Sequence, residues 1–244
     1  MIFYRIYQFL IMMPLLLVAT FIAATLTIIG SVAGFGRTMG YWPGRIWARV
    51  FCLLSWVKVE VRGRENIDPA TSYVFVANHQ GAYDIFAIYG YLGHNFRWMM
   101  KKSLEKIPLV GYSCRAAGHI YVNNSSPSAV RATMEDAEKQ LAGGMSVVVF
   151  PEGARTRDGR MHAFRRGAYS LAVEFGLPVV PVTIDGAFKV MPRNARLPRP
   201  GRIILTIHKP IAPGPGGRHE LSELMARSAQ AIESALPPEN RPKN

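Results

Sequence analysis

A histidine and an aspartate with four residues between them, His79 and Asp84, follow the apolar run 73–77 in the stretch NHQGAYD. Histidine is the side chain whose ordinary pKa suits it to take up a proton near neutral pH. A carboxylate on its other ring nitrogen fixes the tautomer and stabilises the imidazolium that forms. If a strand ends at Ala77 and a helix begins near Tyr83, the loop between them can return Asp84 to His79, and the pair predicts general-base catalysis.

Taken alone, this spacing has a plainer interpretation. A surface loop that leads into a helix often carries a carboxylate in the first helical turn, where the helix dipole favours negative charge. His79 and Asp84 therefore need a second polar element at the same edge of the fold before a catalytic role is favoured.

The second polar element is FPEGAR, residues 150–155, which also follows a strand-like run, SVVVF. Glycine lets the backbone come close to a ligand, and the planar fork of arginine suits phosphate. The surrounding segment is densely basic and contains Arg155, Arg157, Arg160, Arg165 and Arg166. By itself it can be a surface loop that binds anions without specificity, but its pairing with the histidine motif favours a phosphate-binding site.

Composition limits the partners of such a site. The chain has 244 residues, 49% of them apolar, and a formal net charge of +13 from 29 basic and 16 acidic residues. A basic surface of this kind attracts nucleic acid, anionic lipid headgroups or acidic substrates. The two cysteines, Cys52 and Cys114, are too few for a disulfide framework and lack metal-ligand spacing.

The N-terminal region makes a lipid partner the expectation. Residues 9–29 are almost wholly apolar, and no charge occurs between Arg5 and Arg37. A membrane-spanning helix needs ~20 such residues, whereas the apolar part of a signal peptide has only ~7–15. A second apolar stretch covers residues 46–57. Two arrangements stay open: a spanning helix followed by an interfacial one, or a hairpin within one leaflet.

Flanking charges predict the orientation of this anchor. The basic residues that follow the apolar run outnumber Arg5, which precedes it; they are Arg37, Arg45, Arg49 and Lys58. The positive-inside rule then predicts a membrane-anchored protein whose catalytic domain lies on the cytoplasmic face.

The remainder of the chain reads as alternating strands and helices. Short apolar runs rich in β-branched and aromatic residues predict strands at 57–61, 73–77, 96–100, 119–122, 146–150, 179–184 and 203–208. Helices are expected at 83–92, 127–142, 167–175 and 220–235. This order is typical of an α/β domain with a mainly parallel sheet and helices on both faces, where ligands gather beyond the carboxyl ends of strands.

Three regions follow from this pattern. Residues 1–57 are expected to be a helical membrane-anchoring segment, residues 58–236 the catalytic domain, and residues 237–244 a disordered tail.

With these blocks in place, the chain resembles the glycerolipid acyltransferase family, most closely its lysophosphatidic acid acyltransferases. The resemblance rests on NHQGAYD and FPEGAR, and on two further blocks over roughly residues 58–210. They are KKSLEKIPLVGYSCRAAGHIYV at 101–122 and RRGAYSLAVEFGLPVVPVTI at 165–184. The resemblance implies a glycerol-phosphate acyltransferase-like fold behind N-terminal membrane-anchoring helices.

The resemblance also implies residue roles. His79 would act as the general base on a glycerol hydroxyl while that oxygen attacks a thioester, and Asp84 would orient His79. The substrate would be bound by Asn78, Lys101, Glu152, Gly153 and Arg155. No metal is expected and no cofactor, only acyl carrier protein or coenzyme A carrying the acyl co-substrate. The reaction would convert lysophosphatidic acid to phosphatidic acid in phospholipid biosynthesis, with membrane lipid as a partner and no nucleic acid.

One departure keeps a different acceptor open. Where the family's second block ends in an arginine that contacts the acceptor phosphate, this chain has Asn123 and Asn124. Either Lys101, Lys102, Arg115 or Arg165 supplies a second cation, or the enzyme acylates another lysolipid. Two further alternatives are a non-catalytic membrane-bound lipid-binding protein and a metal-assisted lipid hydrolase that uses His79, Asp84 and Glu152.

Overall fold

A sheet of seven strands forms the centre of the part of the chain that the computed structural model describes, namely residues 2–123, 125–141, 144–214 and 218–243. The strand order is β1-β7-β6-β2-β5-β3-β4. Every pairing is parallel except that of β7 with β6. The strands are β1 (Val57–Arg62), β2 (Val74–Ala77), β3 (Phe96–Lys101), β4 (Ile120–Val122), β5 (Ser146–Val149), β6 (Val179–Asp185) and β7 (Gly201–Ile207).

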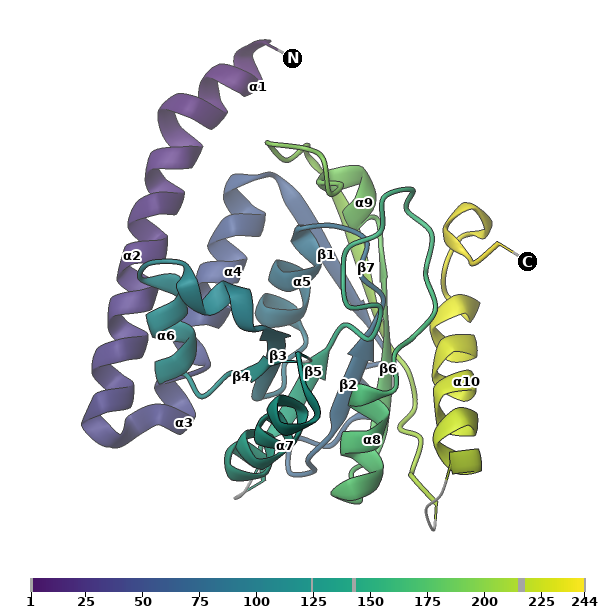
Figure 1. Cartoon of the computed structure of the whole chain (residues 1–244). Helices are drawn as coiled ribbons and strands as arrows, with labels where there is room; N and C mark the ends of the chain where they lie inside the picture. The colour runs from purple at the N-terminus through teal and green to yellow at the C-terminus, as the bar shows by residue number, and fades with distance from the viewer. Residues whose placement is uncertain (1, 124, 142–143, 215–217, 244) are drawn as a thin grey trace.

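Helices cover both faces of this sheet, as Figure 1 shows, which confirms the predicted α/β class. The α-helices are α1 (Ile2–Tyr7), α2 (Met13–Gly30), α3 (Gly36–Met39), α4 (Trp42–Leu54), α5 (Tyr83–Tyr91), α6 (Val110–Ala116), α7 (Pro127–Leu141), α8 (Gly167–Glu174), α9 (Ala187–Val190) and α10 (Arg218–Ser234). Shorter turns of other helix types are η1 (Gln8–Met12), η2 (Ser31–Phe35), η3 (Arg64–Asn66), η4 (Lys102–Lys106) and η5 (Pro238–Asn240).

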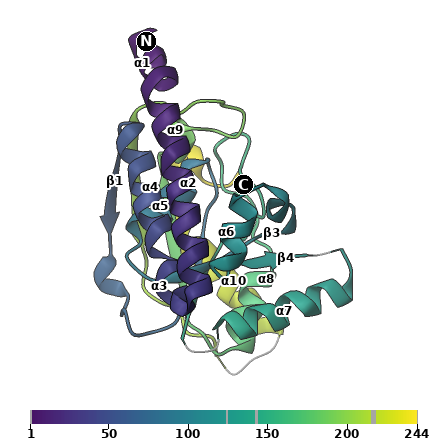
Figure 2. The ribbon, with the colours of Figure 1, turned by 90° about the vertical axis from the view of Figure 1, so that its left-hand side faces the viewer.

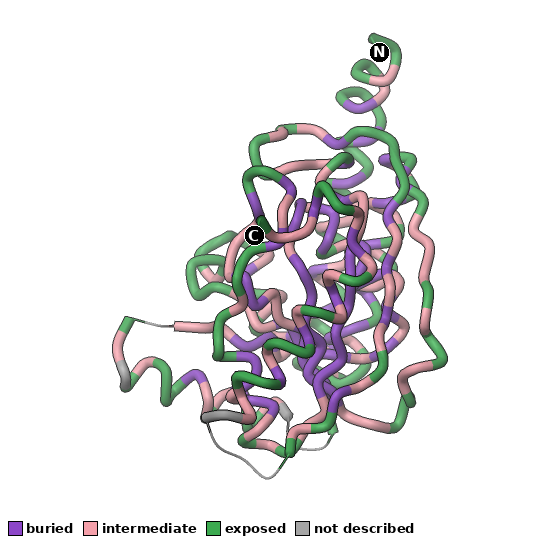
Figure 3. Tube along the Cα trace, turned by 90° about the vertical axis from the view of Figure 1, so that its right-hand side faces the viewer, coloured by how far each residue is buried: buried purple, intermediate pink, exposed green. Residues whose placement is uncertain are grey.

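Strand β2 lies in the middle of the sheet and explains why its sequence lacks polar alternation. All four of its residues are buried, with Phe75 and Ala77 in the core beneath α4 and α5, and Val74 and Val76 in the core shared with α7, α8 and α10. Each fully buried aliphatic or aromatic side chain contributes roughly 1.5–3 kcal/mol. Figure 3 shows the buried residues concentrated along the central strands.

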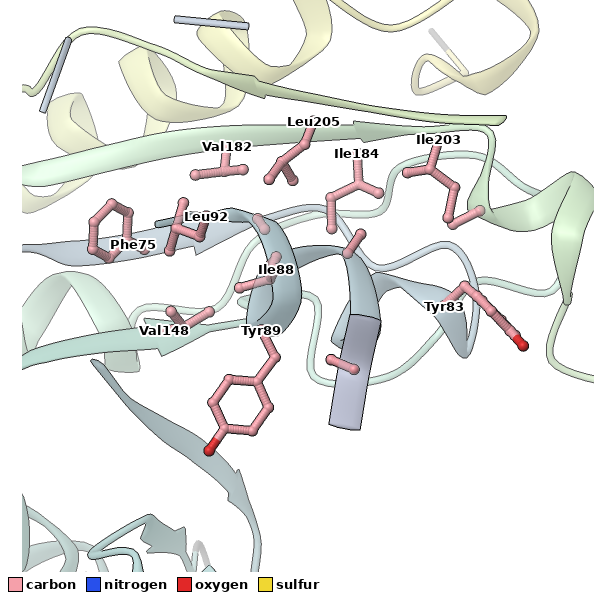
Figure 4. Close-up of a cluster of buried hydrophobic side chains, with 14 of the residues drawn as sticks. Phe75, Tyr83, Ile88, Tyr89, Leu92, Val148, Val182, Ile184, Ile203 and Leu205 are labelled. Atoms are coloured by element: carbon pink, nitrogen blue, oxygen red, sulfur yellow. The ribbon is translucent and has the colours of Figure 1, made fainter. Parts of the chain in front are cut away.

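Helix α5 fixes the position of the residues that precede it. Ile88 and Leu92 lie over side chains of β2, β5 and β6, as Figure 4 shows, and both are at most 1% exposed. Because α5 is held by this packing, the loop between β2 and α5 has both of its ends fixed.

The N-terminal helices α1, η1 and α2 run as one long helix along the side of the domain (Figure 1). This helix is long and apolar enough to cross a membrane. Its inner side packs on α4 and α6, and the Tyr7 hydroxyl donates to the Leu54 carbonyl at 2.9 Å, while the Gln8 amide donates to the Pro198 carbonyl at 2.8 Å. Its outer side exposes large apolar residues such as Leu17 and Phe21.

The second apolar stretch, helix α4, has one side in the core and leaves Ile46 and Leu53 exposed. Helix α4 buries Ala48 and Cys52 in the same cluster as α5. At the other end of the chain, the expected disordered tail contains a turn, η5, and Asn240 is buried there. The expectation of disorder is therefore wrong for this turn, because Asn240 has hydrogen-bond partners inside the domain; residue 244 lies outside the described residues.

Candidate functional site

The two polar motifs meet at one edge of the sheet because β2, β5 and β3 are neighbours in the strand order. NHQGAYD begins where β2 ends, and FPEGAR begins where β5 ends. The strands β2 and β5 are parallel, so their carboxyl ends carry both loops to the same place.

His79 and Asp84 form a direct hydrogen bond, with Nδ1 of the ring 2.7 Å from Oδ2 of the carboxylate. The same Oδ2 accepts the backbone N–H of Gly81 at 2.8 Å. A side chain at position 81 would collide with the Ala187 carbonyl, so glycine is required for the loop to approach α9 this closely. The Asp84 side chain is fully buried, whereas the His79 side chain is 13% exposed. With Nδ1 held by Asp84, Nε2 is the ring nitrogen left for a substrate.

Aromatic stacking fixes the plane of the His79 ring. The Phe150 ring lies parallel to it with a centroid separation of 3.9 Å and an interplanar angle of 9°. Trp98 stacks on Phe150 in turn, with centroids 5.5 Å apart. Phe150 ends one predicted strand and Trp98 lies within another. The stacking of Phe150 on His79, and of Trp98 on Phe150, depends on β2, β5 and β3 being neighbours in the sheet.

Glu152 joins the backbone of two loops of the site. Its Oε1 accepts the His79 backbone N–H at 2.7 Å, and its Oε2 accepts the His162 backbone N–H at 2.9 Å. Burial raises the pKa of Glu152 to about 7, the negative charges of Asp84 and Asp158 act in the same direction, and the two backbone N–H groups oppose them. The structure places this carboxylate between two loops, and its predicted contact with substrate stays a prediction.

Asn78 also has a structural position. It is fully buried, and its amide exchanges two hydrogen bonds with the backbone of Ile184, each 2.8 Å long. These bonds tie the end of β2 to β6. One N–H of the Asn78 amide and one lone pair of its oxygen are used in these bonds, and its contact with substrate stays a prediction.

The loop after Gly153 carries the cations of the site. Gly153 has φ of +76°, and a Cβ there would lie 2.9 Å from the Arg165 guanidinium, so glycine allows Arg165 to cross this loop closely. Arg155 is partly buried two residues further on. The next backbone N–H, that of Thr156, donates to the His79 carbonyl at 2.9 Å. Arg155 is thus adjacent in sequence to a direct backbone contact with His79.

The other candidate cations take different positions. Lys101 is exposed at the end of β3, two strands from β2 in the sheet. Lys102 and Arg115 both form ion pairs with Glu105. Arg165 is therefore the one of these four that the structure brings against the FPEGAR loop, and Asn124 lies outside the described residues.

Sequence reasoning missed the residues that hold the loop 156–162. The Gly159 carbonyl accepts the side-chain amide of Gln80 at 3.0 Å and that of Asn240 at 2.7 Å. The backbone N–H of Met161 donates to the Asn240 carbonyl at 2.9 Å. The C-terminal turn thus holds a loop that also contacts His79. No pattern in the sequence predicted the bond between Asn240 and Gly159, which are 81 residues apart.

The arrangement does not resemble a metal centre. Within the described ranges, no group of three His, Cys, Asp or Glu side chains is placed to share an ion. His79, Asp84 and Glu152 in particular are arranged around backbone N–H groups.

Comparison with known proteins agrees with this geometry. The family model described as Acyltransferase matches residues 58–185, a range that includes both polar motifs. The chain belongs to the acyltransferase family.

Relatives of this acyltransferase share the name 1-acyl-sn-glycerol-3-phosphate acyltransferase. A protein of Chlamydomonas reinhardtii is 35% identical over 75% of this chain and 54% of its own length. The chloroplastic LPAT1 of Arabidopsis thaliana is 31% identical over 72% of this chain and 50% of its own. The chain therefore spans about half the length of the curated relatives it matches.

A solved structure extends the likeness to almost the whole fold. The 1-acyl-sn-glycerophosphate (LPA) acyltransferase PlsC of Thermotoga maritima superposes with a TM-score of 0.67 at 27% sequence identity. The match covers 90% of this acyltransferase and 94% of that chain. It includes more of the chain than the family model does.

Proposed function

We propose that this acyltransferase moves a fatty acyl group from a thioester to the free hydroxyl of lysophosphatidic acid, giving phosphatidic acid for phospholipid biosynthesis. The observation that carries the proposal is the pair His79–Asp84, held at a strand end beside a loop that brings Arg155 and Arg165. The names of the relatives support the same acceptor.

In the proposed reaction, Nε2 of His79 takes the proton from the acceptor hydroxyl while that oxygen attacks the thioester carbonyl. Asp84 keeps Nδ1–H in place and stabilises the imidazolium. The C–S bond then breaks, and the proton on His79 passes to the departing thiolate, so an ester and a free thiol are formed. General-base catalysis of this kind is worth ~10²–10⁴-fold. Both substrates can be held side by side, and no covalent acyl-enzyme is needed.

The acceptor phosphate would lie between Arg155 and Arg165. A phosphomonoester carries roughly −1.5 to −2 charges near pH 7. Arg165 would supply the second cation that Asn123 and Asn124 do not provide at the end of the family's second block. The donor is proposed to be acyl carrier protein or acyl-coenzyme A, since the basic surface suits either acidic carrier.

The N-terminal helix is proposed to hold the enzyme in one leaflet, with the catalytic domain on the cytoplasmic side. Helix α2 packs on α4 and α6, and Gln8 bonds to the domain near the helix start. A helix held along the side of a domain in this way cannot cross the bilayer without taking the domain with it. Its outer apolar side chains are then the surface that meets lipid.

The test is a panel assay on purified protein in detergent micelles. We expect product from lysophosphatidic acid with at least one of the two donors, identified by mass, and no product from a folded His79→Ala protein. Near-normal turnover by that variant would reject the assigned base. A clear preference for a lysolipid that lacks a phosphomonoester would favour the alternative acceptor and leave the acyl-transfer chemistry unchanged.

The phosphate site has its own matched pair of variants. Arg155→Lys should raise the acceptor KM strongly and change the donor KM little, because an ammonium cannot reproduce the bidentate contact of a guanidinium. Arg157→Lys, on an exposed position of the same loop, should leave both constants unchanged. Equal effects of the two variants would argue for a diffuse basic surface in place of a defined phosphate site.

A further inference from the structure

The segment from η4 to α6, residues 102–116, exposes apolar side chains far from the N-terminal helices in sequence. Leu104 is 40% exposed, Ile107 43% and Tyr112 74%. In the described part of the chain after residue 56, the only other exposed large apolar side chains are Ile85 and Val130. Single exposed apolar residues are ordinary, but three within nine residues form a patch, and a patch of this kind marks an interaction surface.

A strained turn holds the two sides of this patch together. Leu109 has φ of 61° and ψ of −51°, and the N–H of Val110 donates to the Pro108 carbonyl at 2.6 Å. These values describe a γ-turn with positive φ, a rare conformation that costs free energy. Gly111 is packed so closely on the Glu105 carbonyl that no side chain would fit there. The turn therefore persists because its surroundings impose it, and it leaves Ile107 and Tyr112 exposed on either side.

Cations surround the apolar side chains. Lys101, Lys102 and Lys106 are all exposed, and the acidic residue of the segment, Glu105, already forms ion pairs with Lys102 and Arg115. Apolar side chains bordered by lysines are the pattern of surfaces that insert shallowly into a bilayer, because the lysine stems lie along the apolar region while their ammonium groups reach anionic headgroups.

The patch is continuous with the apolar side of the N-terminal helix. Helix α2 contacts both α4 and α6, and in Figure 2, which views the molecule from this side, α2 lies between them. Helix α4 also exposes Ile46 and Leu53. Three neighbouring elements thus expose apolar side chains, and η4–α6 is the element among them that adjoins β3, whose end carries Lys101.

We propose that residues 102–112 form a second membrane-docking surface, which binds the headgroup region of an anionic phospholipid bilayer and holds the edge of the catalytic site against it. The proposal rests on the proposed membrane attachment of α2 and does not depend on the identity of the reaction. An acidic carrier protein could also meet the three lysines, but Leu104, Ile107 and Tyr112 and their continuity with α2 favour lipid.

Depth of insertion tests the proposal directly on the full-length protein. In a Cys114→Ser background, where the remaining Cys52 is buried, single cysteines are placed by Ile107→Cys, Leu17→Cys and Arg227→Cys and labelled with bimane. Leu17 lies on the outer side of α2, and Arg227 is exposed on α10 at the opposite side of the domain (Figure 1). In vesicles that contain phosphatidylglycerol and a doxyl-labelled lipid, the labels at 17 and 107 should be quenched and the label at 227 should not.

Quenching at 17 without quenching at 107 would overturn the proposal. This readout needs no acyl transfer, so it stands apart from any failure of the proposed reaction.

A second measurement uses Leu104→Ser with Ile107→Ser. We expect the apparent KM for a vesicle-bound acceptor to rise ~5-fold or more and the KM for a dissolved short-chain acceptor to stay the same. An increase confined to the KM for acyl carrier protein would also overturn the proposal, in favour of a protein partner.

Discussion

Replacing Asp84 with asparagine separates two contributions that the His79–Asp84 pair combines, namely charge and orientation. Oδ2 of Asp84 accepts two N–H groups, from His79 and from Gly81. Oδ1 is buried and has no hydrogen-bond partner among the described residues. An asparagine oxygen in the place of Oδ2 can therefore accept both bonds. The reverse orientation would point the amide nitrogen at the Gly81 N–H, so Gly81 selects the orientation that keeps the histidine tautomer.

The expected loss of rate in Asp84→Asn is consequently the loss of charge. Two unit charges about 4 Å apart interact by about 4 kcal/mol at an effective dielectric constant of about 20. The dipole of the asparagine amide retains part of this, so about 2–4 kcal/mol of transition-state stabilisation should be lost. Because ~1.4 kcal/mol is a tenfold change in rate, kcat should fall by a factor of roughly 30–1,000.

Release of free thiol during acyl transfer gives kcat for Asp84→Asn, Asp84→Ala and His79→Ala in the same detergent. We expect the order Asp84→Asn, then Asp84→Ala, then His79→Ala, from most to least active, because alanine removes orientation as well as charge. Asp158→Asn is the matched control: the exposed Asp158 carboxylate accepts hydrogen bonds from Thr156 and Arg160, and among the described residues it has none with His79. A kcat for Asp84→Asn within ~3-fold of the unaltered enzyme would refute the charge argument, and equality with Asp84→Ala would refute the orientation argument.

Three further outcomes follow from the site and its supports. Burial raises the pKa of Glu152 to about 7, so between its ordinary pKa and about 7 the folded protein holds a proton that the unfolded chain releases. Stability should therefore fall as pH rises through about 7. The difference in Tm between pH 5 and pH 8 should be smaller for Glu152→Gln than for the unaltered protein, and an equal difference would contradict the assignment. Asn240→Ala removes the donor to the Gly159 carbonyl and should lower kcat and destabilise the protein by about 1 kcal/mol. The control Ser234→Ala, on the exposed end of α10, should change neither quantity. Identical kinetics of the two variants would show that the C-terminal turn does not position the loop 156–162. Glutamate at Leu17 and Phe21, on the outer side of α2, should move the folded protein from membranes to the soluble fraction, and full retention at high salt would reject this side as the lipid contact.

The polar motifs and the class of fold followed from the sequence, since both depend on local order. Apolar runs without alternation predicted the central strands, because a strand covered on both faces has no polar side to show. His79, Asp84 and Arg155 were found because they follow such runs directly, and the family resemblance added roles to them. Short helices such as α6 and α9 were not predicted, since Pro108 before α6, Gly111 within it and Gly186 before α9 signal turns.

The strand order and every long-range support of the site were decided by the tertiary structure. The sheet places β5 next to β2, so Phe150 stacks on His79 and Glu152 accepts its backbone N–H, although neither contact can be read from spacing along the chain. The same packing bonds Asn78 to the backbone of β6 and places Asn240, from the expected tail, against the loop 156–162. Long-range hydrogen-bond partners leave no pattern in the sequence, because a buried amide bonds to whichever backbone group the fold brings to it. The sequence therefore indicates which residues can do chemistry, and only the fold decides which residues hold them in place.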